Sequence, residues 1–273
     1  MSQVAPTSYS ELAEALNQVE QCRIIGTGTG QEWLPASESP LLSTKHLNKI
    51  LDFRPDDLVV TVQSGLRTAD LQSEISKAGL CLPFAPSFTD WLSPAQGTVG
   101  GLLALGLPHA NEAKFGQVRD WVTGMKLMLA DGRIVSVGAQ VVKSVAGYDL
   151  HRTMVGSRGG LAVILEATLR LRSIASLTEP DLFLSGEPVR NCWVHRFPRS
   201  KFEELANQVP QPLAGDCESG LLWSALPASN LGDGWAIGPS GQRRPGPTGI
   251  PATWERNLRN MMDPTGKFDA GWI

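Results

Sequence analysis

The chain has 273 residues, of which 42% are hydrophobic and 19% are charged, and its formal net charge is −3. This length can bury a substantial core in one large domain or two smaller ones. The small negative charge gives no electrostatic reason to expect nucleic acid as a partner. No apolar run approaches the roughly 20 residues that span a bilayer, and the first residues do not resemble a secretory signal, so we expect no membrane span.

The four cysteines are far apart in the sequence, and no two of them form a C-x-x-C pair. We therefore expect reduced, mostly buried thiols in a reducing compartment, the cytoplasm. No H-x-H or H-x-x-x-H pair occurs, so we predict no metal site.

A glycine-rich loop follows the first predicted strand. Ser8 or Ser10 can cap a helix that runs to about Val19, and residues 22–25 then predict a short buried strand. The strand leads directly into the loop, which consists of Gly26, Thr27, Gly28, Thr29 and Gly30. Successive amides in such a turn can form an anion nest that suits a pyrophosphate. A purely structural glycine turn explains the loop alone equally well. Residues 31–35 do not begin a helix, which disfavours a Rossmann dinucleotide site.

The next segments predict two hairpins and a helix. Residues 51–53 and 58–62 form apolar runs around a turn at 54–57, and residues 121–129 and 134–137 do the same around 130–133. A helix is expected at 69–78, with Leu71, Ile75 and Ala78 facing inward and Gly79 ending it.

A second glycine loop lies in residues 83–106, a long segment with little periodicity of the kind that is usually functional. Thr98, Val99, Gly100 and Gly101 predict a turn that opens a helix whose first amides are free to hold an anion. The alternative is a joint whose small residues serve packing. Arg119 and Asp120, just before a predicted strand, are expected to form a surface ion pair.

Residues 143–172 join a Gly-Tyr-Asp turn, a short helical link, a glycine-rich elbow and a strand. This order indicates a chain that wraps around a flat, charged cofactor with its backbone amides facing it. The segment 142–150, VKSVAGYDL, and the C-terminal segment 262–271, MDPTGKFDAG, are further distinctive motifs.

Together these motifs resemble the FAD-binding domain of the vanillyl-alcohol oxidase/PCMH flavoprotein superfamily, and in particular the FAD-binding subunits of bacterial glycolate oxidases. Phe115 and Gly116 with Arg119 and Asp120 replace a family Tyr-Gly-x-x-Arg-Asp. The resemblance covers about residues 24–171, with a return at 262–271. It implies an α+β fold, namely a PCMH-type FAD-binding domain of two α/β subdomains with a strongly shortened C-terminal cap.

The resemblance also implies the cofactor and its site. FAD is expected to be held non-covalently, because no histidine stands in the usual loop contexts for covalent attachment. Ala162 replaces a usual glycine, and Asp269 replaces a usual asparagine, which puts a negative charge near a flavin edge. The residues expected to bind the cofactor are Gly26, Thr27, Gly28, Thr29, Gly30, Pro86, Thr98, Val99, Gly100, Gly101, Gly116, Arg119, Asp120, Gly156, Ser157, Gly159, Val163 and Ile164.

We expect three parts in the chain: the FAD-binding domain at 1–172, a reduced cap with a Gly/Pro-rich linker at 173–253, and a segment at 254–273 that returns to the FAD domain. In the cap we expect strands at 191–197 and 221–226, a helix at 200–209, and an extended or disordered linker from 232 to 251. His195 and Arg196 are its most prominent polar pair, for which a structural role is expected. His109 and His151 are expected to be exposed or packing residues.

The function implied by the resemblance is that of a FAD-binding subunit in a glycolate dehydrogenase-like complex that oxidises a 2-hydroxy acid, glycolate or D-lactate. Its partners would be a second flavin subunit and an iron–sulfur subunit. Lys143 and Tyr148 are the catalytic candidates nearest the flavin; the alternatives are a phosphate contact and core packing. Two other functions remain open: a non-catalytic electron-transfer or scaffold subunit that uses an exposed Trp235 as an anchor, and a degenerate member without FAD.

Overall fold

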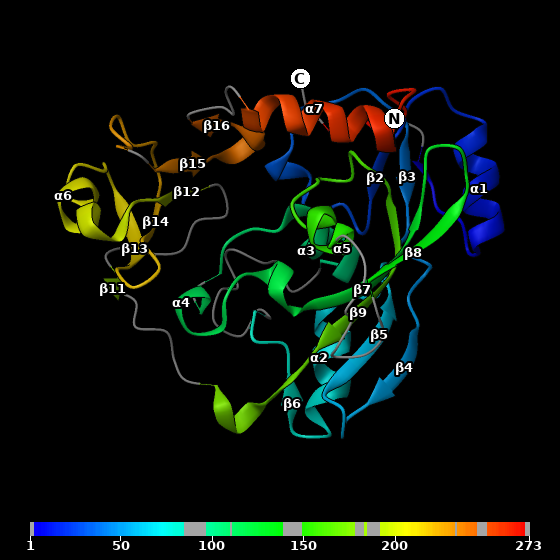
Figure 1. Cartoon of the computed structure of the whole chain (residues 1–273), viewed down its shortest axis with the longest axis horizontal. Helices are drawn as coiled ribbons and strands as arrows, with labels where there is room; N and C mark the ends of the chain where they lie inside the picture. The colour runs from blue at the N-terminus through cyan, green and yellow to red at the C-terminus, as the bar shows by residue number, and fades with distance from the viewer. Residues whose placement is uncertain are drawn as a thin grey trace.

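The computed structural model describes residues 3–84, 97–109, 111–138, 149–177, 183–184, 192–232, 234–244 and 250–270. Within these ranges the chain forms two lobes (Figure 1). We call residues 3–177 the first lobe and residues 183–244 the second lobe. The second lobe is drawn mostly in yellow and orange, and helix α7 (Ile250–Met262) runs from it back along the first lobe.

A five-stranded antiparallel sheet forms the centre of the first lobe, in the order β4-β5-β9-β7-β8. The two predicted hairpins are confirmed as β4-β5 and β7-β8, and β9 pairs between them. The strands are β4 (Ile50–Arg54), β5 (Val59–Gln63), β7 (Val122–Met128), β8 (Ile134–Gly138) and β9 (Val163–Arg170). Helices on both faces bury β9 along almost its whole length.

Helices α2 (Thr68–Ser76) and α3 (Val99–Leu105) share one core with this sheet, and α1 (Tyr9–Asn17) shares another. The predicted cap of α1 is confirmed, because the Ser8 hydroxyl accepts a hydrogen bond from the Glu11 amide at 3.2 Å. Helix α2 ends at Ser76, so Ala78 lies beyond it and is exposed, and the prediction that Ala78 faces inward is wrong.

A small parallel sheet, in the order β1-β3-β2, lies beside α1. Its strands are β1 (Gln3–Val4), β2 (Arg23–Ile25) and β3 (Leu41–Ser43). The glycine loop after β2 is followed by a three-residue 3-10 helix, Gln31–Trp33, where the sequence predicts none. This turn is much shorter than the helix of a Rossmann unit. The other described strands and α-helices of the first lobe are β6 (Leu80–Cys81), α4 (Glu112–Phe115), α5 (Leu150–Met154) and β10 (Arg172–Ser173). Two short 3-10 helices, Val118–Trp121 and Ile174–Ser176, also belong to it.

The second lobe is built on a six-stranded sheet in the order β11-β13-β14-β12-β15-β16. Its elements are β11 (Phe183–Leu184), β12 (Trp193–Arg196), α6 (Phe202–Ala206), β13 (Pro212–Asp216), β14 (Leu221–Ser224), β15 (Trp235–Ile237) and β16 (Arg243–Arg244). The prediction of an extended or disordered linker at 232–251 is wrong for the described residues of that segment, because β15 pairs with β12, β16 pairs with β15, and α7 begins at Ile250.

Trp235 is likewise not the exposed anchor that the sequence suggests. Its side chain is half-buried, and the Arg196 guanidinium carbon lies 5.6 Å from the centre of its ring. Glycine and proline density misled the prediction here, because the strand is held by pairing with a distant segment.

The C-terminal segment returns to the first lobe. After α7, the Asp263 carboxylate accepts hydrogen bonds from the amides of Lys267 (2.8 Å) and Phe268 (2.9 Å) and so closes a tight turn. The Cys22 amide donates to the Lys267 carbonyl, and Phe268 is fully buried in the core beside α1. Residues 267–269 thus extend the parallel sheet at β2.

Helices and antiparallel sheets confirm the α+β class. The four cysteines are free, and Cys22, Cys81 and Cys192 are buried while Cys217 is exposed. In the described parts of the chain, no helix is long and apolar enough to cross a membrane. Among the same residues, no group of three histidine, cysteine or acidic side chains is arranged to hold a metal ion.

Candidate functional site

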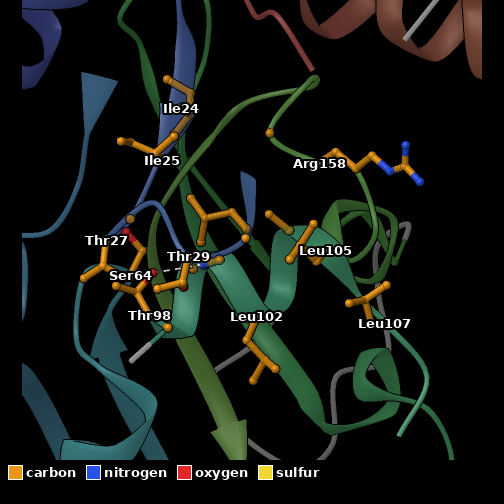
Figure 2. Close-up of a pocket in the computed structure, with 18 of the residues that line it drawn as sticks. Ile24, Ile25, Thr27, Thr29, Ser64, Thr98, Leu102, Leu105, Leu107 and Arg158 are labelled. Carbon is orange, nitrogen blue, oxygen red and sulfur yellow. Dashed lines mark hydrogen bonds between the residues drawn. The ribbon is translucent and has the colours of Figure 1, made fainter. Parts of the chain in front are cut away.

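A cavity lies between the first glycine loop, helix α3 and the start of β9 (Figure 2). Its volume is about 1090 Å3, the solvent at its mouth included. The structure brings together most of the predicted cofactor-binding residues in its lining: Gly26, Thr27, Gly28, Thr29, Gly30, Thr98, Gly100, Gly101, Gly159 and Ile164.

The other described candidates lie outside this lining. Val163 points into the core around α1, while its neighbour Ile164 faces the cavity, because successive strand residues point to opposite faces. Val99 is fully buried in the core of the first lobe. The rest of this group is Gly116, Arg119, Asp120, Gly156 and Ser157. Pro86, Lys143 and Tyr148 lie outside the described residues.

Arg119 and Asp120 do not form the expected surface ion pair. The Asp120 carboxylate accepts a hydrogen bond from the Gln117 amide at 2.9 Å, and the Arg119 side chain is exposed. Asp120 therefore fixes the turn before β7.

The first glycine loop is held close to α3. Gly26 lies so close to Thr98 that a Cβ atom at residue 26 would stand 2.1 Å from the Thr98 hydroxyl. Gly28 has a φ of +89°, a backbone conformation that residues other than glycine rarely adopt. The amides of Gly28, Thr29 and Gly30 donate to no group in the described parts of the chain. The loop therefore presents successive amide donors of the kind that bind anions.

The first amides of α3, in contrast, are all occupied, so the prediction that they are free for an anion is wrong. The Val99 amide donates to the Leu66 carbonyl (2.8 Å), and the Gly100 amide donates to the Ser64 carbonyl (2.7 Å). The Gly101 amide donates to the Thr98 hydroxyl at 3.2 Å. The alternative, a packing joint, describes this end of the helix correctly.

Two buried polar atoms in the lining have no hydrogen-bond partner among the described residues: Oγ of Ser64 and Nδ1 of His109. An unpaired buried polar group costs free energy that a polar ligand can recover. Figure 2 places Ser64 close to Thr27 and Thr98. Sequence reasoning missed both residues, since neither lies in a motif and their shared cavity is formed only by folding.

Charge in the lining favours an anionic ligand. Arg158 is its only charged residue among those described, and no carboxylate faces the cavity there. Arg158 is buried with a φ of +56°, and its amide donates to the Ala104 carbonyl at 2.7 Å. Its side chain extends away from Thr27 and Thr98 in Figure 2.

The two departures from the family pattern fall in different places. Ala162 lines the cavity and is almost fully buried, so its methyl group forms part of the cavity wall. Asp269 lies outside the lining and faces Arg23, with Oδ2 3.5 Å from Nη2. Asp269 therefore adds no negative charge to the lining of this cavity.

His195 and Arg196 have structural partners. Nε2 of the fully buried His195 lies 2.8 Å from the Ser224 hydroxyl, and its ring stacks between Trp193 and Phe197. Burial lowers the pKa of His195 to about 4. Arg196 forms an ion pair at 2.5 Å with Glu112 of the first lobe.

Comparison with known proteins supports a nucleotide site. Residues 3–138 match a family described as FAD binding domain. The glycolate oxidase subunit GlcD of Bacillus subtilis is 33% identical over 174 residues, which are 62% of this chain and 36% of that protein. The glycolate oxidase subunit GlcE of Escherichia coli is 35% identical over 131 residues, which are 47% of this chain and 36% of that protein. A D-lactate dehydrogenase of Anaerostipes hadrus is 36% identical over 187 residues, or 65% and 38%. This chain thus spans less than half the length of these relatives.

The fold also has solved counterparts. A structure of alkyldihydroxyacetonephosphate synthase superposes with a TM-score of 0.52 at 20% identity, over 76% of this chain and 36% of that one. The cavity suits FAD, because free loop amides, a buried arginine and two polar atoms without a partner among the described residues line the same space. Residues 3–138 of the chain therefore belong to the FAD-binding domain family that they match.

Proposed function

We propose that this chain is the FAD-binding subunit of an oxidoreductase that oxidises a small 2-hydroxy acid, glycolate or D-lactate. The observation that carries the proposal is the cavity between the Gly26–Gly30 loop and α3, in a chain whose relatives include glycolate oxidase subunits and D-lactate dehydrogenases. Bound FAD would supply the hydride acceptor, while the protein supplies position and electrostatic field.

Different residues of the cavity would bind different parts of the cofactor. The amides of Gly28, Thr29 and Gly30 would face the pyrophosphate, and the Ser64 hydroxyl would complete that end. Ala162 and Ile164 would form an apolar wall against a flat ring. We retain Lys143 and Tyr148 as the proposed residues beside the flavin.

The proposed division of the chain is a FAD-binding domain at 1–172, a reduced cap at 173–253 and a returning segment at 254–273. The separate six-stranded sheet of the second lobe supports it. We also propose partners, a second flavin subunit and an iron–sulfur subunit, because GlcD and GlcE are named as subunits.

A second candidate is a FAD-binding subunit without substrate chemistry of its own. The observation that favours it is that every described residue of the cavity lining lies between Ile24 and Ile164, so none comes from the second lobe. In this case the substrate would be oxidised on a partner chain.

Anaerobic mixing with glycolate or D-lactate separates the two candidates. Bleaching of the flavin band in the isolated chain is the expected result for a catalytic subunit. Bleaching that requires the partner subunits would favour the second candidate, and no bleaching in either case would contradict both. Release of FAD into the supernatant on acid precipitation would support non-covalent binding.

A further inference from the structure

His109 has one ring nitrogen committed to the protein. Its Nε2 atom lies 2.9 Å from the carbonyl oxygen of Gly116, the residue that ends α4. A carbonyl only accepts hydrogen bonds, so Nε2 must carry the proton. Burial lowers the pKa of His109, which keeps the ring neutral. Nδ1 therefore carries a lone pair and is an acceptor.

This acceptor has no donor in the described parts of the chain. His109 is 5% exposed, its Nδ1 is buried without a hydrogen-bond partner, and the residue lines the cavity. A buried acceptor left unpaired costs free energy, whereas a ligand donor in the cavity would satisfy it. Nδ1 requires a hydrogen-bond donor in the ligand, because an anionic oxygen could not pair with this lone pair.

His109 shares the cavity lining with Leu107. Leu107, two residues earlier, lies well apart from Thr27, Ser64 and Thr98 in Figure 2. Leu107 also packs against the core of the second lobe. The charges of Glu112 and Arg196, whose ion pair joins the two lobes, also act on the pKa of His109.

We propose that His109 is a ligand-binding residue whose Nδ1 accepts a hydrogen bond from an N–H or O–H group of the ligand held in this cavity. The donor belongs either to FAD or to the hydroxyl of a 2-hydroxy acid beside it. The inference rests on the proposed function, since it takes the cavity to be the FAD site.

The variant that tests this proposal is His109→Gln. A glutamine Nε2 can reproduce the donation to the Gly116 carbonyl but leaves no acceptor at the position of Nδ1. His195→Gln is a matched control, because His195 is also buried and lies outside the cavity lining. Like His109, it has a partner on Nε2 and none on Nδ1 among the described residues. Apo-protein melting temperatures identify any variant that is merely unfolded.

Fluorescence titration of the apo-proteins with FAD gives the first readout. We expect His109→Gln to raise the Kd for FAD roughly tenfold and His195→Gln to leave it unchanged. If the donor is the hydroxy acid, the Kd for FAD stays constant. The concentration of glycolate or D-lactate that half-saturates anaerobic flavin reduction then rises by a similar factor.

Equal values of both quantities in His109→Gln and the unaltered chain would overturn the proposal. Failure of the unaltered chain to bind FAD would instead refute the proposed function, and the inference with it.

Discussion

Thr98 occupies the space that any side chain at Gly26 would need, since a Cβ atom there would stand 2.1 Å from its hydroxyl and 2.8 Å from its methyl group. The same hydroxyl accepts the hydrogen bond from the Gly101 amide that caps α3. The first glycine loop and the start of α3 are therefore fitted to each other, and together they form one side of the cavity.

Gly26→Ala should accordingly push the loop away from α3. We expect this variant to bind FAD at least tenfold more weakly and to lose about 1–3 kcal/mol of unfolding free energy, as overpacked sites do. FAD titration and urea unfolding measure the two effects.

Thr98→Ala in the same background is the matched control, since it removes the two closest atoms. The double variant should recover part of the FAD affinity relative to Gly26→Ala alone. Strictly additive losses would contradict the proposed contact.

Ser64→Ala should separate stability from binding. Its hydroxyl is buried and has no partner among the described residues, so replacing the hydroxyl with hydrogen removes an unsatisfied polar atom. We expect the apo-protein to be as stable as before or up to about 1 kcal/mol more stable, while FAD binds several-fold more weakly. A less stable apo-protein whose affinity for FAD is unchanged would exclude Ser64 from the site.

The sequence predicted the elements whose signals are local. The Ser8 cap of α1 and the two hairpins depend on residues that are neighbours in the chain, and all three are confirmed. The strands β13 and β15 were missed because they are defined by pairing with β14 and β12 rather than by their own composition.

The features of the candidate site also differ in how well the sequence predicts them. The glycine loop could be identified from its composition, but the occupied amides of α3 could not, because their acceptors Ser64 and Leu66 lie more than thirty residues earlier. Gly100 illustrates the consequence. A Cβ atom there would stand 2.7 Å from Cβ of Ser64, so Gly100→Val would disrupt packing whether or not the loop touches phosphate.

The ion pair between Glu112 and Arg196 should contribute strongly to stability. The Glu112 side chain is only 6% exposed, so Arg196→Met would leave a buried carboxylate without its cation. We expect a loss of roughly 3–5 kcal/mol in unfolding free energy. Adding Glu112→Gln should restore much of it, and a double variant as unstable as Arg196→Met would contradict this account.

Stability should fall with pH below neutrality because three histidines are buried. Burial lowers the pKa of His195 to about 4 and also lowers the pKa values of His109 and His151. Unfolded histidine titrates near pH 6.5, so between about pH 6.5 and 4 the unfolded chain binds more protons than the folded chain. The stabilisation is complete above this window and is lost progressively as the pH falls through it.

His195→Phe tests this dependence, since a flat ring fits between Trp193 and Phe197. The free energy of unfolding, measured with urea at pH 5 and at pH 7, should differ by less in the variant. The reason is that the His195 contribution of roughly 3 kcal/mol over the whole window is absent. An unchanged difference would assign the pH dependence to other groups.

The central claim, that the cavity beside Gly26–Gly30 holds FAD, is tested most directly by the melting temperature of the apo-protein with and without FAD. At about 100 times the Kd, the bound cofactor should add about 2.7 kcal/mol to the unfolding free energy and raise the melting temperature by several degrees. The complex should show the visible absorption bands of an oxidised flavin. A colourless protein whose melting temperature does not respond to FAD would contradict the claim.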